Sequence, residues 1–396
     1  MKRGVRKRVQ AGLSLIELMI ALVIGTLLIL GAVQVFAASR SAYMISEGIA
    51  RVQENGRFAL DFLQRDIRMA GHMGCVNDQA HFRNNPVGLQ TTFALNPVPG
   101  LDFGVSIQGY EATGTEPGAS LEIDETPELG GSAYTPVLPT AIADATSNRV
   151  DGSDILALRF LASEGVPVTG ISGTPAEPVF HFDASHWEVL RSGTDNPGLF
   201  GVADCLGVTI FQASAVNSSD GTVTFGAAAN NAPGATFSHV FTPGQVMIFR
   251  AESVAYYVGF NGTTNNPALY RARFHAAPGA ALVADVQELV EGVENMQFIY
   301  GVDRELNFDA PPSGYIDRQL VASATELGTQ EEGWRRVGSV QVALLASSPS
   351  RAAAAQPNSD DAELIGGGVI FETPEDGRYR AVYQSTIALR NRLYGN

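Results

Sequence analysis

The chain has 396 residues, with 26 basic and 41 acidic side chains and a formal net charge of −15. This length predicts one large domain or two modest ones. The acidic balance argues against a broad nucleic-acid interface, which needs a basic stripe, so we expect no nucleic-acid partner.

The N-terminal segment predicts a membrane anchor. Five cations lie within residues 2–8, one acid follows at Glu17, and the 21 residues 18–38 carry no charge. A helix of that length crosses a hydrocarbon core of about 30 Å. The cations are expected to hold the N-terminus in the cytoplasm, which gives one pass through the inner membrane and a periplasmic head.

Residues 12–18 read Gly-Leu-Ser-Leu-Ile-Glu-Leu, with basic residues before the glycine and an apolar run after the acid. This pattern resembles the type III signal of type IV pilins and their relatives. The resemblance implies a leader of residues 1–12, cleavage after Gly12 by a prepilin peptidase, and methylation of the new N-terminal residue, Leu13. Many family members have Phe at that position; Leu13 also gives an apolar start.

Glu17 is the candidate assembly residue. A carboxylate at the head of a membrane span is costly, which favours a functional role. Leu13 and Glu17 are four residues apart and share a helix face, so a freed amine at Leu13 gives Glu17 a cationic partner in its own chain or in a neighbouring subunit. The alternative is a boundary acid that reaches the headgroups.

Cleavage after Gly12 leaves 21 arginines against 41 acids, a net charge of −20, and no lysine. Because no lysine remains in the mature chain, catalysis by a lysine Schiff base or a lysine general base is excluded. The competing interpretation is an ordinary secretory signal cleaved near Ala37 or Ala38, which makes the protein an exported soluble enzyme with an unfamiliar site. A secretory apolar core is usually only about 7–15 residues, shorter than this one.

Residues 39–70 predict an amphipathic helix that continues the transmembrane part, residues 13–38. Apolar residues recur at spacings of three, four and seven, which is a helical period. They are Ile45, Ile49, Val52, Ala59, Leu63, Ile67 and Ala70. One helix from about 14 to 69 is roughly 80 Å long, and Gly48 and Gly56 are its expected bending points.

The rest of the chain predicts a large β-rich head. Residues 71–150 are rich in Pro, Gly, Asn and acids and predict a loop-rich insertion, either plain elaboration or a partner-facing surface. Residues 151–396 predict the β-rich globular head, with β-branched and aromatic runs bounded by turn residues. The spacing of Val286, Leu289, Val290 and Val293 predicts a short helix before the strand at 296–302.

Three segments near the C-terminus extend the resemblance. They read LVEGVENMQFIYG from residue 289, VQVALL from 340 and TIALRN from 386. Their order resembles minor pilins of the PilW type and, more loosely, GspJ-type minor pseudopilins of type II secretion. The resemblance implies an α+β fold, in which a long N-terminal helix is followed by a pilin-like head.

It also implies a non-catalytic function: a minor pilin that assembles with other minor pilins and the major pilin and primes the type IV pilus, near its tip. Two alternatives stay open beside the soluble enzyme. One is a minor pseudopilin of a type II secretion system. The other is a tip adhesin or ligand-binding module on a pilin stalk.

The remaining candidate sites are few. Cys75 and Cys205 predict one disulfide in an oxidising compartment, or else two buried free thiols. His181 and His186 flank Asp183, and Asp303 precedes Asn307 and Asp309, but neither spacing is specific enough to predict a metal. The motifs HExxH, GxSxG, GxxxxGK[ST] and CxxC do not occur in the sequence. We therefore expect no enzyme site, no metal and no cofactor.

Overall fold

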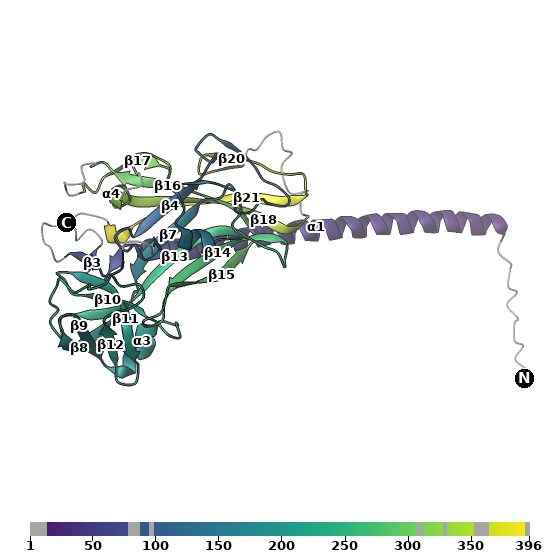
Figure 1. Cartoon of the computed structure of the whole chain (residues 1–396). Coiled ribbons are helices and arrows are strands. Elements are labelled where there is room, and N and C mark those ends of the chain that lie inside the picture. Colours follow the sequence, from purple (N-terminus) through teal and green to yellow (C-terminus); the bar gives the residue numbers. More distant parts are fainter. Residues whose placement is uncertain are drawn as a thin grey trace, which may run out of the picture.

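The structure is a computed structural model that describes residues 14–77, 88–94, 99–305, 310, 312–327, 331–351 and 364–392. A long N-terminal helix enters a β-rich head, and only its second half lies within the head (Figure 1). This is the α+β architecture that the sequence predicted.

Helix α1 spans Leu15–Met69, 55 residues without a break. At 1.5 Å per residue it is about 80 Å long. Its first half contacts nothing in the head, whereas its second half buries a stripe of small and apolar residues. These are Gly48, Val52, Gly56, Ala59, Leu63 and Ile67, with Asp66 beside them.

Two antiparallel sheets form the part of the head that receives α1. The first has the order β17-β16-β18-β21, and the second has the order β15-β14-β13-β7-β4-β6. The first consists of β16 Val293–Asp303, β17 Ile316–Leu320, β18 Val337–Arg351 and β21 Arg378–Ala388. The second consists of β4 Ile107–Ala112, β6 Tyr134–Thr135, β7 Ile155–Leu161, β13 Met247–Asn261, β14 Asn266–His275 and β15 Val283–Glu291.

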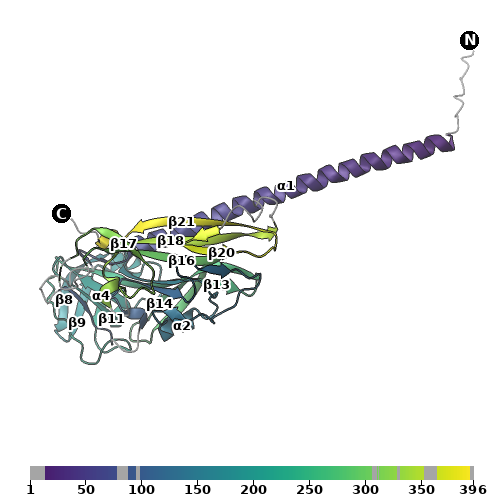
Figure 2. The same cartoon turned by 90° about the horizontal axis from the view of Figure 1, so that it is seen from above.

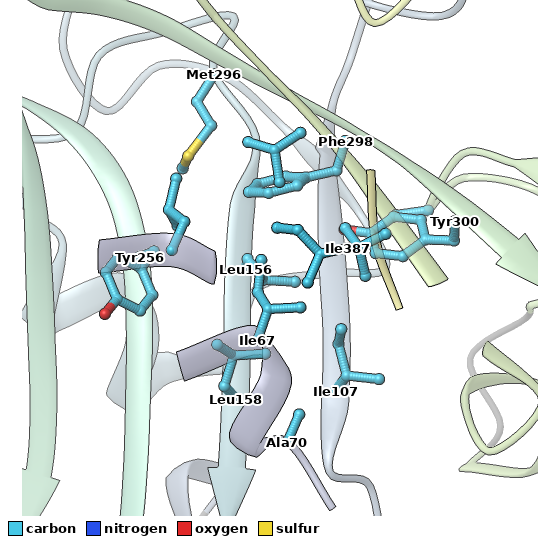
Figure 3. Packing of buried hydrophobic residues seen from close by; sticks show 14 of the residues in the cluster. Ile67, Ala70, Ile107, Leu156, Leu158, Tyr256, Met296, Phe298, Tyr300 and Ile387 are labelled. Atoms are coloured by element: carbon cyan, nitrogen blue, oxygen red, sulfur yellow. The ribbon is translucent and has the colours of Figure 1, made fainter. Parts of the chain in front are cut away.

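The main hydrophobic core lies where α1 meets both sheets. Ile67 of α1 belongs to one buried cluster with Leu156 and Tyr256 of the second sheet and with Phe298 and Ile387 of the first (Figure 3). Burying an aliphatic or aromatic side chain of this size contributes about 1.5–3 kcal/mol. The helix is therefore a component of the core.

A closed barrel, continuous with the second sheet through β13, occupies residues 166–250. Its five complete strands are β8 Val166–Thr174, β9 Glu177–Phe182, β10 Leu199–Ala203, β11 Val208–Asn217 and β12 Thr222–Phe225. The start of β13 closes the ring, because Ile248 pairs with Val202 of β10 on one side and with Val166 of β8 on the other. Buried phenylalanines from all the complete strands except β8 fill the interior, so the barrel is a packed core without a free edge.

Short elements complete the described residues. The strands are β1 His72–Met73, β2 Val76–Asn77, β3 Leu89–Thr91, β5 Ser120–Glu122, β19 Leu364–Gly366 and β20 Val369–Glu372. The helices are α2 Thr140–Ala145, α3 Trp187–Arg191, α4 Glu331–Trp334 and the 3-10 turns η2 Pro99–Leu101, η3 Ala184–His186 and η5 Arg390–Arg392.

One sequence prediction is wrong. Residues 283–291 form strand β15, not a helix, because they pair along their length with β14. The apolar spacing that predicted the helix also fits a strand with one bulge, and the register does shift at Leu269 and Tyr270 of β14.

The disulfide expected from the two cysteines is present. Cys75 lies in the turn between β1 and β2, just after α1 ends, and Cys205 lies in the turn between β10 and β11. Their Cα atoms are 4.9 Å apart and 130 residues apart in the chain. The disulfide therefore ties the barrel to the end of the anchor helix.

Replacing both cysteines, Cys75→Ser with Cys205→Ser, is expected to lower the free energy of unfolding by about 2–5 kcal/mol, because the long loop is no longer closed in the unfolded chain. The measurement is denaturant unfolding of the full chain in detergent under oxidising conditions. Equal unfolding midpoints for the double variant and the wild type would contradict this account.

Two buried carboxyl groups lie between β4, β7 and β16. Asp154 accepts hydrogen bonds from the backbone N–H groups of Ala112 and Phe298, each at 3.0 Å, and Glu111 accepts one from Ala322 at 3.2 Å. Burial raises the pKa of both carboxyls, and the charge of Asp154 raises the pKa of Glu111 further. Each therefore favours its neutral form in the folded protein.

A carboxyl whose pKa is raised by folding stabilises the fold fully below its ordinary pKa, and this stability is lost as the pH rises through the raised value. Glu111→Gln should therefore stabilise the protein relative to wild type by about 1 kcal/mol more at pH 8 than at pH 5. Thermal unfolding of the full chain in detergent at the two pH values measures this difference. Glu125→Gln, at an exposed acid, is the control, and a Glu111→Gln effect that does not depend on pH would rule the explanation out.

Candidate functional site

The N-terminal end of α1 is built around Glu17. The backbone N–H of Ser14 donates to Glu17 Oε2 at 3.0 Å, and the N–H of Ile16 donates to Ser14 Oγ at 3.3 Å. This capping box satisfies donors that the first helical turn leaves free. Gly12 and Leu13, the predicted processing residues, lie outside the described residues.

The first half of α1 is an exposed apolar rod. Its large hydrophobic side chains, from Leu15 to Phe36, are more than half exposed, and no part of the head covers them. Within the described residues α1 is the one helix that is long and apolar enough to cross a membrane. So much apolar surface on a helix is stable only in lipid or against other helices.

The second half of α1 approaches the head closely through small residues. Gly56 lies directly under Tyr383 of β21, so closely that an added Cβ would be 2.5 Å from the tyrosine ring. Gly48 is also buried. Of the two glycines that the sequence predicts as bending points, Gly56 is therefore a place where the head contacts the helix, and both are buried within an unbroken helix.

Polar contacts fix the position of α1 along its length. Tyr256 Oη donates to Asp66 Oδ2 at 2.5 Å, and Arg271 lies 3.5 Å from the same oxygen. Burial, and then the nearby Asp66 charge, raises the pKa of Tyr256 well above its usual range, so the hydroxyl stays a donor. On the other side of the helix, Gln64 Nε2 donates to Ser385 Oγ at 3.0 Å.

The end of α1 is capped by a residue distant in sequence. The side-chain amide of Asn391 donates to the backbone oxygens of Arg68, Met69 and Ala70, at 3.0, 3.3 and 3.2 Å. These carbonyls have no partner within the helix. Asn391 belongs to the TIALRN segment quoted for the resemblance, but the sequence did not indicate its role in holding the helix.

The outward side of α1 stays partly apolar inside the head region. Met44, Phe58 and Phe62 are exposed, with Phe58 at 47% and Phe62 at 38%. Their spacings of 14 and four residues place them along one side of the helix. These three residues, the outward stripe, give this side of the helix exposed apolar side chains after residue 38, with the exposed Arg51 between Met44 and Phe58.

The residues considered for metal binding do not converge. His181 Nε2 lies 2.7 Å from Ser172 Oγ on the barrel, while Asp183 accepts hydrogen bonds from Ser185. The Asp303 carboxylate accepts hydrogen bonds from the backbone N–H and hydroxyl of Ser313 and from the backbone N–H of Gly314, in the loop that follows it. Asn307 and Asp309 lie outside the described residues. The described part of the chain contains no group of three side chains that could hold a metal.

Two family models match the chain. Residues 7–33 match the prokaryotic N-terminal methylation motif, and residues 255–391 match the family of type IV pilus-assembly protein W. No curated protein and no solved structure matches the chain. The first match, on a helix with this exposed apolar half, is consistent with a membrane-anchored protein of the prepilin class.

The second match is more specific: residues 255–391 are similar to the PilW family, which supports a PilW-type pilin, as the resemblance predicted, and points to a structural pilus-assembly protein rather than a known enzyme family. The matched residues run from the middle of β13 to η5 and include Tyr256, Tyr383 and Asn391, which hold α1. The barrel of residues 166–250 lies outside both matches.

The close contact at Gly56 gives a test of this docking. Gly56→Ala should lower the free energy of unfolding by about 1–3 kcal/mol, because the added methyl group must displace Tyr383. Gly31→Ala is the matched control, since nothing lies within 4 Å of a Cβ at Gly31. Unfolding of the full chain in detergent measures both, and a neutral or stabilising Gly56→Ala would show that the head does not hold the helix at this point.

Proposed function

We propose that this protein is a minor pilin that assembles with other minor pilins and the major pilin and primes the type IV pilus from its tip. The observation that carries this proposal is the exposed apolar half of α1. Lipid covers this surface in the inner membrane, and helices of neighbouring subunits replace lipid in a filament. The outward stripe gives those helices a surface that continues beyond residue 38.

Processing prepares the helix for assembly. A prepilin peptidase removes residues 1–12 after Gly12, and the new amine lies at Leu13, one residue before the helix cap. Glu17 then neutralises that amine in its own chain or in a neighbour within the apolar bundle. An unpaired charge there is costly, so the pair selects one register between adjacent helices.

The size of the head supports a position at the tip. The barrel projects sideways from the sheets that hold α1 (Figure 1). Such a head at every position of a narrow filament would collide with its neighbours, whereas the end of a filament has room for it. The match to the PilW family favours the pilus over the closest alternative, a minor pseudopilin of type II secretion.

A second function is favoured by one observation. The barrel lies outside the matched residues, at the end of the head far from the N-terminus (Figure 1), and a disulfide joins it to the end of α1. A module in that position is suited to contact a surface or ligand. Binding assays with the full chain, with and without the disulfide, distinguish an adhesin from an assembly subunit.

Glu17 supplies the direct test of assembly. Glu17→Gln keeps a capping acceptor and removes the charge, whereas Glu17→Ala removes both. We expect both variants to stay in the membrane fraction and to fall at least about tenfold in sheared filaments, because the amine of Leu13 is left unpaired. Quantitative immunoblots of the two fractions measure this ratio.

Glu47→Ala is the control, since Glu47 is half-exposed and, among the described residues, pairs with Arg51 of the same helix. If Glu17→Gln enters filaments as well as the wild type while Glu17→Ala does not, the residue acts as a helix cap and the charge mechanism is wrong. If the wild-type protein itself is absent from filaments, the proposed function fails.

A further inference from the structure

Strand β21 is the outermost strand of the sheet that holds α1. It lies beside α1 (Figure 2); it pairs with β18, and no other described strand pairs with its second edge, here called the free edge. The free edge extends along 11 residues, Arg378–Ala388, which is long for an edge strand. A free edge presents unpaired backbone donors and acceptors to any strand that approaches it.

The hydrogen-bond pattern shows which donors point outward. The N–H of Leu389 donates to Gly338 O at 2.9 Å, and Gly338 immediately precedes the β18 residue that pairs with Ala388. Donors alternate along an antiparallel strand, so the odd-numbered residues bond to β18. The N–H groups of Val382, Gln384, Thr386 and Ala388 therefore face away from the sheet.

Beyond Arg380, this edge lacks the charges that protect other edges. Residues 381–389 contain no charged residue and no proline. By contrast, β15 carries Asp285, Glu288 and Glu291, and β17 carries Asp317 and Arg318. Natural proteins place charge, proline or a bulge on free edges to prevent strand addition. The absence of such protection from Ala381 onward favours the addition of a strand along that part of β21.

The position of β21 brings this edge close to the assembly surface. Tyr383 packs on Gly56, and Ser385 bonds to Gln64, so the strand lies directly along the second half of α1. A subunit that packs its helix against α1 therefore brings its own head near β21. This proximity favours a neighbouring pilin-like subunit over a soluble ligand.

We propose that the free edge of β21, from Val382 to Ala388, binds an extended segment of a neighbouring pilin-like subunit by strand addition. The proposal rests on the proposed function, because it requires assembly with other pilins. Seven residues of strand give a contact about 23 Å long. Main-chain hydrogen bonds supply the affinity in such a contact, and alternate side chains supply the choice of partner.

The test removes one backbone N–H that faces away from β18 and leaves the hydrogen bonds between β21 and β18 in place. Thr386→Pro deletes an N–H that faces away from β18, and Thr386→Ala keeps the N–H while it removes the exposed side chain. A photocrosslinking residue at position 386 of the full-length protein, irradiated in piliated cells, reports the neighbour. The control places the photocrosslinking residue at position 319, in place of Gln319, on the charged edge strand β17.

We expect crosslinks to another pilin-like subunit from position 386 and not from position 319. Wild type and Thr386→Ala should co-purify with that subunit equally, and Thr386→Pro should lose at least about tenfold of the complex while it stays folded and in the membrane. Ala388→Pro, a second outward position, is expected to give the same loss and serves if Thr386→Pro unfolds.

Two results overturn the proposal and are separable. If the wild type enters filaments but position 386 gives no crosslink and the proline variants co-purify normally, the edge is not an interface and the pilin function stands. If the wild type does not enter filaments, the pilin function fails and the strand proposal fails with it.

Discussion

Helix α1 lies in two environments, and the rest of the structure depends on this: its first half needs apolar surroundings outside the head, and its second half packs inside the head. From Leu18 to Ala38 its first half carries no charge and exposes mainly apolar side chains, suited to lipid or to other helices. Its second half is buried along one stripe and is therefore part of the core of the head. Because both halves are one unbroken helix of 55 residues, the head cannot detach from its anchor without losing its own core.

The head holds this helix from several directions. Gly56 allows β21 to approach α1 closely. Within the core, Asp66 accepts a hydrogen bond from Tyr256, and at the end of α1 the side-chain amide of Asn391, in the last described turn, caps the free carbonyls. The disulfide then connects the same end to the barrel. A force along the anchor is consequently distributed over both sheets and the barrel, which suits a subunit that is pulled from a membrane into a filament.

The sequence predicted the features that depend on local pattern. The charge-free run predicts the first half of the helix. The helical period of Val52, Leu63 and Ile67 predicts its buried stripe, and the two cysteines predict the disulfide. The barrel could not be predicted, because it closes through Ile248 and Val202, which are 46 residues apart. The apolar spacing of residues 283–291 fits a helix as well as a strand, and only the pairing of β15 with β14 decides between them. The roles of Asn391 and of the Glu111–Asp154 pair likewise depend on distant partners.

The central claim is that α1 remains attached to the head as a processed pilin anchor. The most direct test is the mature N-terminus, determined by mass spectrometry of the protein from membrane and sheared-filament fractions. The account predicts a chain that begins at Leu13 with one added methyl group in both fractions. A chain that begins near Ala38 or Ser39 would contradict it, because the exposed half of α1 would then be a discarded signal.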